Sequence, residues 1–169
     1  MRLLKTAMTL ALCAAACLCL TSSGKKAQKH VITFHLESDE SHYPKFATPV
    51  KLGSQAKQYY FEIMPSVTEK DIDWFYPFVS KDGRTFGAAF KLQPSRARHL
   101  QGLTQENNGK LIGARVVGAQ LSATMIDRPI EDGILVIWDG LGREQLMLFK
   151  KYFPHVEDLQ KARGTADAR

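Results

Sequence analysis

The sequence predicts an α+β fold, in which two helices pack on one face of a mostly antiparallel sheet. Several short segments alternate apolar and polar residues with the period of a strand, and two longer segments carry apolar residues at helical spacing. From residue 84 onward the order is strand, helix, strand, strand, strand, helix, which is typical of α+β domains. With 44% hydrophobic and 24% charged residues among 169, the chain has the composition of a folded domain and not of a disordered one.

Residues 1–24 are predicted to be a secretory signal peptide. Arg2 and Lys5 precede an apolar run over residues 7–20, and small polar residues follow it. The run is shorter than the roughly 18 apolar residues that a transmembrane helix needs. A retained membrane anchor and a buried helix are the alternatives for this segment.

All three cysteines lie in this segment, which excludes a disulfide-stapled scaffold for the rest of the chain. The stretch Ala14-Ala15-Ala16-Cys17 loosely matches a lipoprotein signal, although the usual Leu three positions before the cysteine is missing. Lipidation of Cys17, with a lipid-anchored or peripheral membrane association, is therefore the alternative to ordinary signal cleavage. Export places the rest of the chain in the periplasm or cell envelope.

The chain that follows the signal begins with two predicted strands, residues 30–36 and 58–64, in which apolar and polar residues alternate. Pro44 and Pro49 favour an extended or looped connection between them. After the second strand, Thr68 is placed to cap a single helical turn, with a loop as the alternative.

The second half of the chain is predicted to contain four strands and both helices. Ser95 is the expected N-cap of the first helix, whose apolar stripe includes Leu100 and Thr104. Residues 134–138 are almost continuously apolar, which indicates a central buried strand. The expected elements are, in order, a strand at 84–92, a helix that opens at 94–95 and ends at 107–109, strands at 110–117, 120–126 and 134–138, and a helix at 142–153.

Two sequence blocks in the C-terminal half carry a resemblance to a known family. Residues 103–111 (LTQENNGKL) form a helix end followed by Asn-x-Gly-Lys and a strand. Residues 129–137 (PIEDGILVI) form a Pro/Ile loop, a glycine and a strand, with Gly140 before the last helix. Over about residues 63–153 the chain resembles the head subdomain of the first periplasmic domain of SecD/SecDF, an accessory subunit of bacterial protein export.

The resemblance implies a stand-alone, head-like module in the same compartment, in contact with other polypeptides. The membrane-spanning helices of SecD have no counterpart in the sequence, so the resemblance does not imply export-motor activity. The expected division of the chain is a signal peptide at 1–24, an N-terminal strand and loop at 25–57, a SecD head-like α+β domain at 58–160 and a flexible tail at 161–169.

No residue pattern in the sequence predicts catalytic residues, a cofactor or a metal site. There is no Gly-x-Ser-x-Gly motif, and Gly140-Leu-Gly142 is too short for a dinucleotide-binding loop. One loop is dense in potential metal ligands, but their spacing matches no known metal motif. These residues are His35, Glu37, Asp39, Glu40 and His42. We therefore expect a protein that is not an enzyme.

The most unusual segment is Trp74-Phe75-Tyr76-Pro77-Phe78, with four aromatic residues in five. In a strand, Trp74, Tyr76 and Phe78 share one side and Phe75 points to the other. A core role predicts that both sides are buried, whereas a binding role predicts an exposed aromatic patch for a peptide, sugar or protein. Trp74, Tyr76 and Phe78 are therefore the candidate partner-binding residues.

Two functional hypotheses follow from the sequence. The first is a non-catalytic exported module that binds an envelope protein or an unfolded polypeptide. The second is an envelope protein that binds a small ligand or glycan through the aromatic segment. The formal net charge of +6 is modest, and export argues against nucleic acid as a partner. A hydrolase would need a polar cleft that joins acids and a histidine.

Overall fold

The structure is a computed structural model that describes residues 30–157 of the chain. The predicted signal peptide, with Cys17, and the predicted tail at 161–169 lie outside the described residues.

Nine strands and two α-helices make up the described part of the chain, which confirms an α+β fold built mostly from antiparallel sheet. The elements, in chain order, are β1 (Ile32–Ser38), the 3-10 turn η2 (Glu40–His42), β2 (Ala47–Leu52), β3 (Lys57–Glu62), β4 (Val67–Thr68), the 3-10 turn η3 (Glu69–Asp71), β5 (Ile72–Val79), β6 (Phe86–Leu92), α2 (Pro94–Glu106), β7 (Leu111–Val116), β8 (Ser122–Met125), β9 (Ile134–Leu141) and α3 (Arg143–Tyr152).

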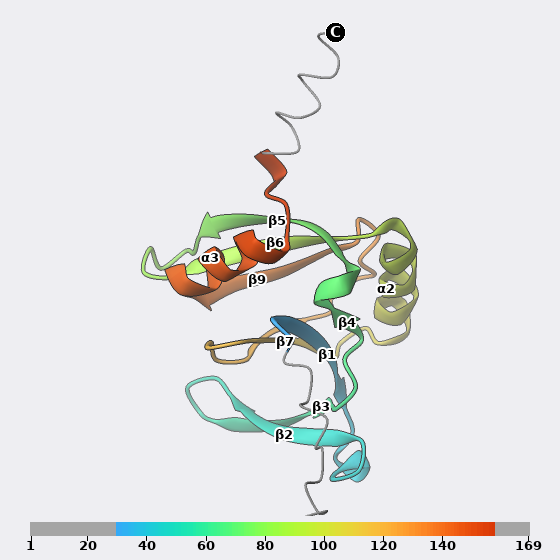
Figure 1. Cartoon of the computed structure of the whole chain (residues 1–169). Coiled ribbons are helices and arrows are strands. Elements are labelled where there is room, and N and C mark those ends of the chain that lie inside the picture. The colour runs from blue at the N-terminus through green and yellow to red at the C-terminus, as the bar shows by residue number, and fades with distance from the viewer. Residues whose placement is uncertain (1–29, 158–169) are drawn as a thin grey trace, which may run out of the picture.

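The strands form two sheets. The larger sheet has the order β2-β3-β1-β7-β8, with β4 also paired to β1, and the smaller sheet has the order β5-β6-β9. Figure 1 shows the smaller sheet and α3 above the larger sheet, with the β2–β3 hairpin at the opposite end and α2 at one side of both sheets. The smaller sheet therefore forms one end of the described molecule.

β1 is the central strand of the larger sheet and is buried on both faces. The alternation of Ile32, Phe34 and Leu36 with Thr33 and His35 confirms the predicted strand, but all five side chains are buried. Burial of a polar group costs free energy unless the group is hydrogen bonded. Thr33 and His35 therefore need partners inside the sheet, and they bond to each other (Oγ1 to Nε2, 2.8 Å).

β6 is the central strand of the smaller sheet. Its Phe90 lies opposite Phe75 of β5 and Leu135 of β9, and all three side chains are buried. Strand neighbours alternate between faces, so the same face also carries Ala88 and Ile137, which are paired and buried. This inner face of the smaller sheet is the side that packs on the core.

Both helices contribute buried side chains to this core. In α2, Leu100 and Thr104 are fully buried, which confirms the predicted stripe. The predicted N-cap is wrong, because the helix begins at Pro94 and Gln93 precedes it. Proline suits the first helical position, where its missing N–H leaves no helical bond unmade. In α3, Phe149 is fully buried and supplies the stripe predicted for the last helix.

Aromatic rings join the layers of the core. The Phe90 ring lies 6.0 Å from Phe34 of the larger sheet, and 5.2 Å from Phe149 and 6.1 Å from Phe153 on the α3 side. Phe75 lies 5.9 Å from Phe149 in an edge-to-face arrangement. Such ring pairs add stability beyond the area they bury, so one phenylalanine of β6 links both sheets and α3.

One prediction about the strands needs correction, and another becomes more specific. Residues 134–138 are not a central strand, because β9 pairs with β6 alone and forms one edge of the smaller sheet. Residues 47–52, which the prolines predicted to be extended or looped, are extended and form β2 at the edge of the larger sheet. Proline is tolerated on an edge strand, where the missing N–H removes no bond to a second neighbour.

Candidate functional site

The outer face of the smaller sheet carries the candidate partner-binding residues. The strand register places Trp74 beside Lys91 and Ile134, Tyr76 beside Ala89 and Val136, and Phe78 beside Gly87. We call this surface the aromatic face. Its side chains are those of Trp74, Tyr76, Phe78, Ala89, Lys91, Ile134, Val136 and Trp138.

The predicted division of the aromatic segment between two faces is present in β5. Phe75 points to the core and is fully buried, whereas Tyr76 on the aromatic face is 44% exposed. Trp74 and Phe78 are half-buried. A register shift between Ile72 and Trp74 precedes this alternation. The segment therefore supplies the core from one side and a largely apolar outer surface from the other.

Phe78 and Trp138 join the two edges of the aromatic face across the central strand. Their ring centroids are 6.2 Å apart in an edge-to-face arrangement. A Cβ atom added to Gly87 of β6 would overlap the Phe78 ring, so the ring lies directly over this glycine. The Trp138 side chain is 58% exposed. Sequence reasoning missed Trp138 as a site residue, because its segment was interpreted as a buried central strand.

Within residues 30–157, α3 packs on the inner face of the smaller sheet and not on the aromatic face. Phe149 and Phe153 of the α3 region contact Phe75 and Phe90, which are inner-face residues. α2 lies at the end of the sheet, where Ala97 is in close contact with Gly133. The aromatic face is thus bordered, but not overlaid, by the helices of the described part.

A cavity of about 590 Å³ adjoins the aromatic face at β9. We call it the β8–β9 cavity, because it lies between β8, residues 126–132 and β9. Its floor consists of Phe34, Ile112 and Ala114 of the larger sheet. Ile134, Val136 and Trp138 line it as well, so the cavity and the aromatic face share one strand. Sequence reasoning did not find the cavity.

The mouth of the β8–β9 cavity is charged, with three acidic side chains against Arg128 and Lys91, whose ammonium group donates to the carbonyl oxygen of Asp132. Asp127, Glu131 and Asp132 line it together with Arg128, and all four residues are exposed. The Asp132 carboxylate accepts a hydrogen bond from the Ile134 amide (2.9 Å), which fixes the turn before β9. In residues 30–157 none of these four side chains takes part in an ion pair.

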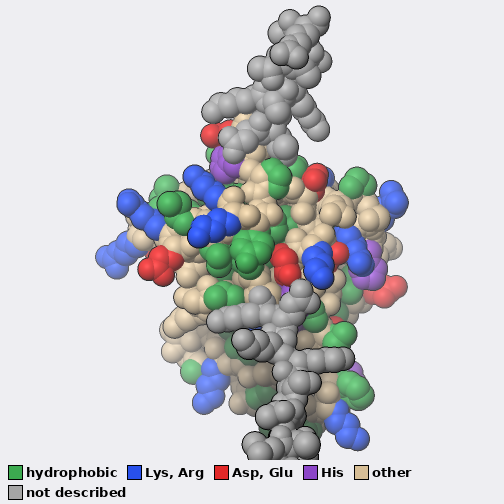
Figure 2. All heavy atoms as spheres, viewed as in Figure 1, with side chains coloured by type: hydrophobic (Ala, Val, Ile, Leu, Met, Phe, Trp, Pro, Cys, Tyr) green, Lys and Arg blue, Asp and Glu red, His purple; other side chains and the backbone are tan. Residues whose placement is uncertain are grey.

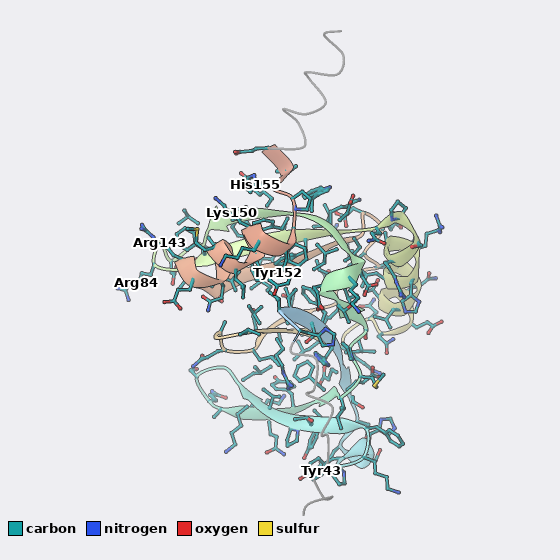
Figure 3. The ribbon with its side chains drawn as sticks, in the orientation of Figure 1. Tyr43, Arg84, Arg143, Lys150, Tyr152 and His155 are labelled. Carbon is teal, nitrogen blue, oxygen red and sulfur yellow. The ribbon has the colours of Figure 1, made fainter. Side chains whose placement is uncertain are left out.

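A polar hollow of about 440 Å³ lies at the other edge of the smaller sheet. It is lined by Tyr76, Lys150 and His155, among others. The His155 ring lies 6.1 Å from the Tyr76 ring and 5.6 Å from the Phe75 ring. Figure 3 shows Lys150 on α3 and His155 just after this helix. The hollow therefore places a cation and an imidazole next to an exposed aromatic residue.

His35 is a titratable group that is buried in the larger sheet. Its Nδ1 donates to the carbonyl oxygen of Glu62 (2.8 Å) and its Nε2 accepts from the Thr33 hydroxyl (2.8 Å), so the neutral imidazole satisfies both bonds. Burial lowers the pKa of His35 below its usual 6.5, and the hydrogen bond to Glu62 acts in the opposite direction. The nearby charge of Arg115 lowers this pKa further.

The five residues considered as metal ligands are directed to other partners. Glu37 accepts a hydrogen bond from the Leu111 amide (2.8 Å), and Asp39 accepts one from the Ser41 amide (2.8 Å). His42 bonds to the Ser38 hydroxyl (2.8 Å) and Glu40 accepts from the Tyr60 hydroxyl (2.8 Å). Among the described residues no group of three or more His, Cys, Asp or Glu side chains is arranged to hold a metal ion.

On the face of the molecule that Figure 2 shows, surface charge is mixed in sign. Figure 2 shows Lys and Arg side chains spread over the levels of α3 and α2, with Asp and Glu side chains among them. This distribution is typical of a solvated surface. In residues 30–157 there is also no helix that is long and apolar enough to cross a membrane.

Comparisons with known proteins give a weak structural likeness. No protein-family model matches the sequence, and no curated protein matches it. Two solved structures of SecDF resemble the chain, one described as a membrane component that enhances protein export and the other as SecDF in a super-membrane-facing form. Each has a TM-score of 0.46 and covers 66% of this chain, with identities of 17% and 16%.

The chain spans 56% of the first of these structures and 17% of the second. Identity and TM-score this low do not establish a family. The resemblance of the two sequence blocks to the SecD head therefore stays a prediction.

Proposed function

We propose that the chain is a non-catalytic, exported module of the cell envelope that binds polypeptides through the aromatic face. The observation that carries the proposal is a sheet face with four large aromatic side chains, two of which, Tyr76 and Trp138, are 44% and 58% exposed. Aromatic side chains bury large areas at low entropic cost and dominate many binding surfaces. An unfolded or extended polypeptide presents the apolar side chains that such a face buries.

A sheet face suits an extended chain better than a compact ligand. The aromatic residues lie on both edge strands, with Trp74, Tyr76 and Phe78 on β5 and Trp138 on β9. The small side chain of Ala89 lies between Tyr76 and Val136, whereas the Phe78 ring covers Gly87. A bound segment that crosses the strands at Ala89 therefore lies close to the sheet and contacts the Tyr76 ring beside the joined rings of Phe78 and Trp138.

A glycan or small ligand is the second candidate, and a separate observation favours it. The hollow beside Tyr76 joins an exposed ring to Lys150 and His155, which supply polar contacts. Sugars bind where aromatic faces and hydrogen-bonding side chains occur together. A glycan array or a ligand-shift screen with the Tyr76→Ala variant as its control tests this candidate.

The location of the module rests on the predicted signal at residues 1–24. Mass spectrometry of the mature protein, recovered from envelope extracts, tests it. An unmodified N-terminus near Gly24 or Lys25 supports signal cleavage, whereas an N-terminal, lipid-modified Cys17 supports a lipid anchor. An N-terminus at Met1 contradicts both.

Binding is tested with the full chain and a fluorescent, uncharged peptide that alternates Leu and Ser. We expect Tyr76→Ala and Trp138→Ala each to weaken its binding by about tenfold, as for truncated aromatic hot spots. Tyr43→Ala is the matched control, because Tyr43 is 53% exposed and lies at the end of the molecule opposite His155 (Figure 3).

Stability separates a binding role of the aromatic face from a core role. If the aromatic face is a binding surface, Trp138→Ala should leave the denaturant midpoint nearly unchanged, because the Trp138 side chain is already mostly hydrated in the folded protein. Unchanged peptide binding in both variants, or a large loss of stability with no loss of binding, would contradict the proposal.

A further inference from the structure

We infer that the β8–β9 cavity takes apolar side chains of a polypeptide segment that carries Lys or Arg beside them, an inference that rests on the proposed polypeptide binding. The inference names the class of segment that the protein selects. Three features of the cavity support it: its apolar wall, its acidic mouth and its continuity with the aromatic face.

The wall of the cavity is suited to aliphatic or aromatic side chains. Phe34, Ile112 and Ala114 form its floor, and Leu135 and Ile126 also line it. These side chains belong to the edge of the main core and are 2–6% exposed. The apolar area still open to an entering side chain is therefore mainly that of Met125 and Trp138, which also line the cavity and are 61% and 58% exposed, and its burial is favourable in proportion to that area.

The mouth of the cavity gives the charge preference. Asp127, Glu131 and Asp132 supply three carboxylates, against the guanidinium group of Arg128 and the ammonium group of Lys91, which donates to the carbonyl oxygen of Asp132. None of them is neutralised by an ion pair within residues 30–157. An ammonium or guanidinium group next to the entering side chain is attracted by this excess of negative charge, and an acidic neighbour is repelled.

The cavity is continuous with the aromatic face along β9. Ile134, Val136 and Trp138 lie on the aromatic face by their register and line the cavity too. One extended segment can therefore lie on the aromatic face while a neighbouring side chain enters the cavity. The aromatic side chains then anchor the segment at one end of β9, and the charged side chains of the cavity mouth select it at the other end.

The experiment compares three labelled peptides that share one Leu-rich core and differ only in their flanks. The flanks are Lys, Ser or Glu, and fluorescence anisotropy of each peptide with the full chain gives the affinity. We expect the Lys-flanked peptide to bind about tenfold more tightly than the Glu-flanked one at low salt. Raising the salt from about 0.05 to 0.5 M should shrink this difference, because the charges at the mouth are exposed.

Two variants with a matched control assign the preference to the cavity mouth. Asp127→Asn with Glu131→Gln should remove most of the preference for Lys flanks, and Arg128→Gln should increase it. The control pair is Glu106→Gln with Glu144→Gln, two exposed acids on the helices that do not line the cavity. It should leave the preference unchanged.

A third variant tests the cavity itself. Thr124 lines the cavity from β8 and is half-buried, so Thr124→Phe places a ring in the space that the inference assigns to the peptide. We expect it to weaken binding of the Lys-flanked and Ser-flanked peptides to similar extents. A thermal melt of the variant checks that it folds, and Ala114→Val provides a smaller filling substitution if it does not.

The outcomes separate this inference from the proposed function. Equal affinity for all three flanks, or a preference that survives Asp127→Asn with Glu131→Gln, overturns the inference while leaving polypeptide binding intact. Binding that depends on Trp138 but ignores Thr124→Phe also overturns it. Failure of all three peptides to bind overturns the proposed function together with the inference.

Discussion

The backbone amide of Ile130 donates a hydrogen bond to Oγ1 of Thr104, 2.9 Å away. The same hydroxyl donates to the carbonyl oxygen of Leu100 (2.8 Å), and the Thr104 side chain is fully buried. Ile130 belongs to the segment between β8 and β9 that walls the cavity. A polar side chain of α2 thus fixes the position of the cavity wall.

Thr104→Val should destabilise the protein although the two side chains have nearly the same shape. The substitution leaves the Ile130 amide without its acceptor, which we expect to lower the free energy of unfolding by about 1–3 kcal/mol. Urea unfolding measures this change. Thr48→Val on the edge strand β2 is the control and should have little effect; an equal loss in both variants would contradict the role of the buried bond.

Gly87→Ala should destabilise the smaller sheet. The added Cβ would overlap the Phe78 ring and lie 2.7 Å from the carbonyl oxygen of Ile137, so ring and strand must both move. We expect a loss of about 1–3 kcal/mol, as for overpacked positions. Gly102→Ala in α2 is the opposite case, because no atom lies within 4 Å of its Cβ position. It should stabilise the protein by about 0.5–1 kcal/mol through helix propensity.

His35 should make the stability of the protein depend on pH below about 6.5. Burial lowers the pKa of the folded-state imidazole, so the unfolded chain binds more protons at pH values between the folded-state pKa and 6.5. The contribution of neutral His35 is therefore complete above 6.5 and is lost as the pH falls toward the folded-state pKa.

Urea unfolding of the wild-type chain and of His35→Gln, measured from pH 8 to 5, tests this dependence. We expect a shallower loss of stability with falling pH in the variant. His99→Gln is the control, because His99 is exposed on α2 and should leave the profile unchanged. A wild-type profile that is flat in this range would contradict the assignment to His35.

Asp82 should titrate with a pKa of about 2 in the turn between β5 and β6. The carboxylate accepts hydrogen bonds from the Ser80 hydroxyl, from the Arg84 amide (2.9 Å) and from the Thr85 amide (3.2 Å), and the first of these is the largest cause of the lowered pKa. The charged form is favoured in the fold, so the turn loses this contribution as the pH falls from about 4 to about 2.

An NMR titration of the Asp82 carboxyl carbon measures this pKa directly. Ser80→Ala should raise it toward 3.8, because the hydroxyl bond is lost. A pKa near 3.8 in the wild-type chain would show that the turn does not hold the carboxylate in this way.

Much of the fold follows from local patterns. Alternation correctly assigned β1 and β6, and helical spacing identified Leu100 and Thr104 as buried. The pattern also placed Trp74, Tyr76 and Phe78 on one side of β5 and Phe75 on the other. These features depend on the intrinsic periods of strands and helices, which the sequence contains.

The error at β9 occurred because an apolar residue is not always a core residue. Continuous apolarity in residues 134–138 indicated a central strand, but Trp138 is 58% exposed on an edge. A buried position and an apolar binding surface have the same composition, so hydrophobicity cannot distinguish them. The β8–β9 cavity needs Phe34, Ile112 and Ile134 to meet in space, and no short-range pattern encodes that meeting.

The segment that follows α3 closes the second edge of the smaller sheet. The Phe75 amide donates to the carbonyl oxygen of Pro154 (3.2 Å), and Phe75 and His155 form a parallel bridge. Phe75 and Pro154 are separated in the sequence by β6, α2, β7, β8, β9 and α3, so this edge contact is a long-range one. A chain that lacks residues 154 and 155 would leave the Phe75 amide, and this edge of β5, without its partner.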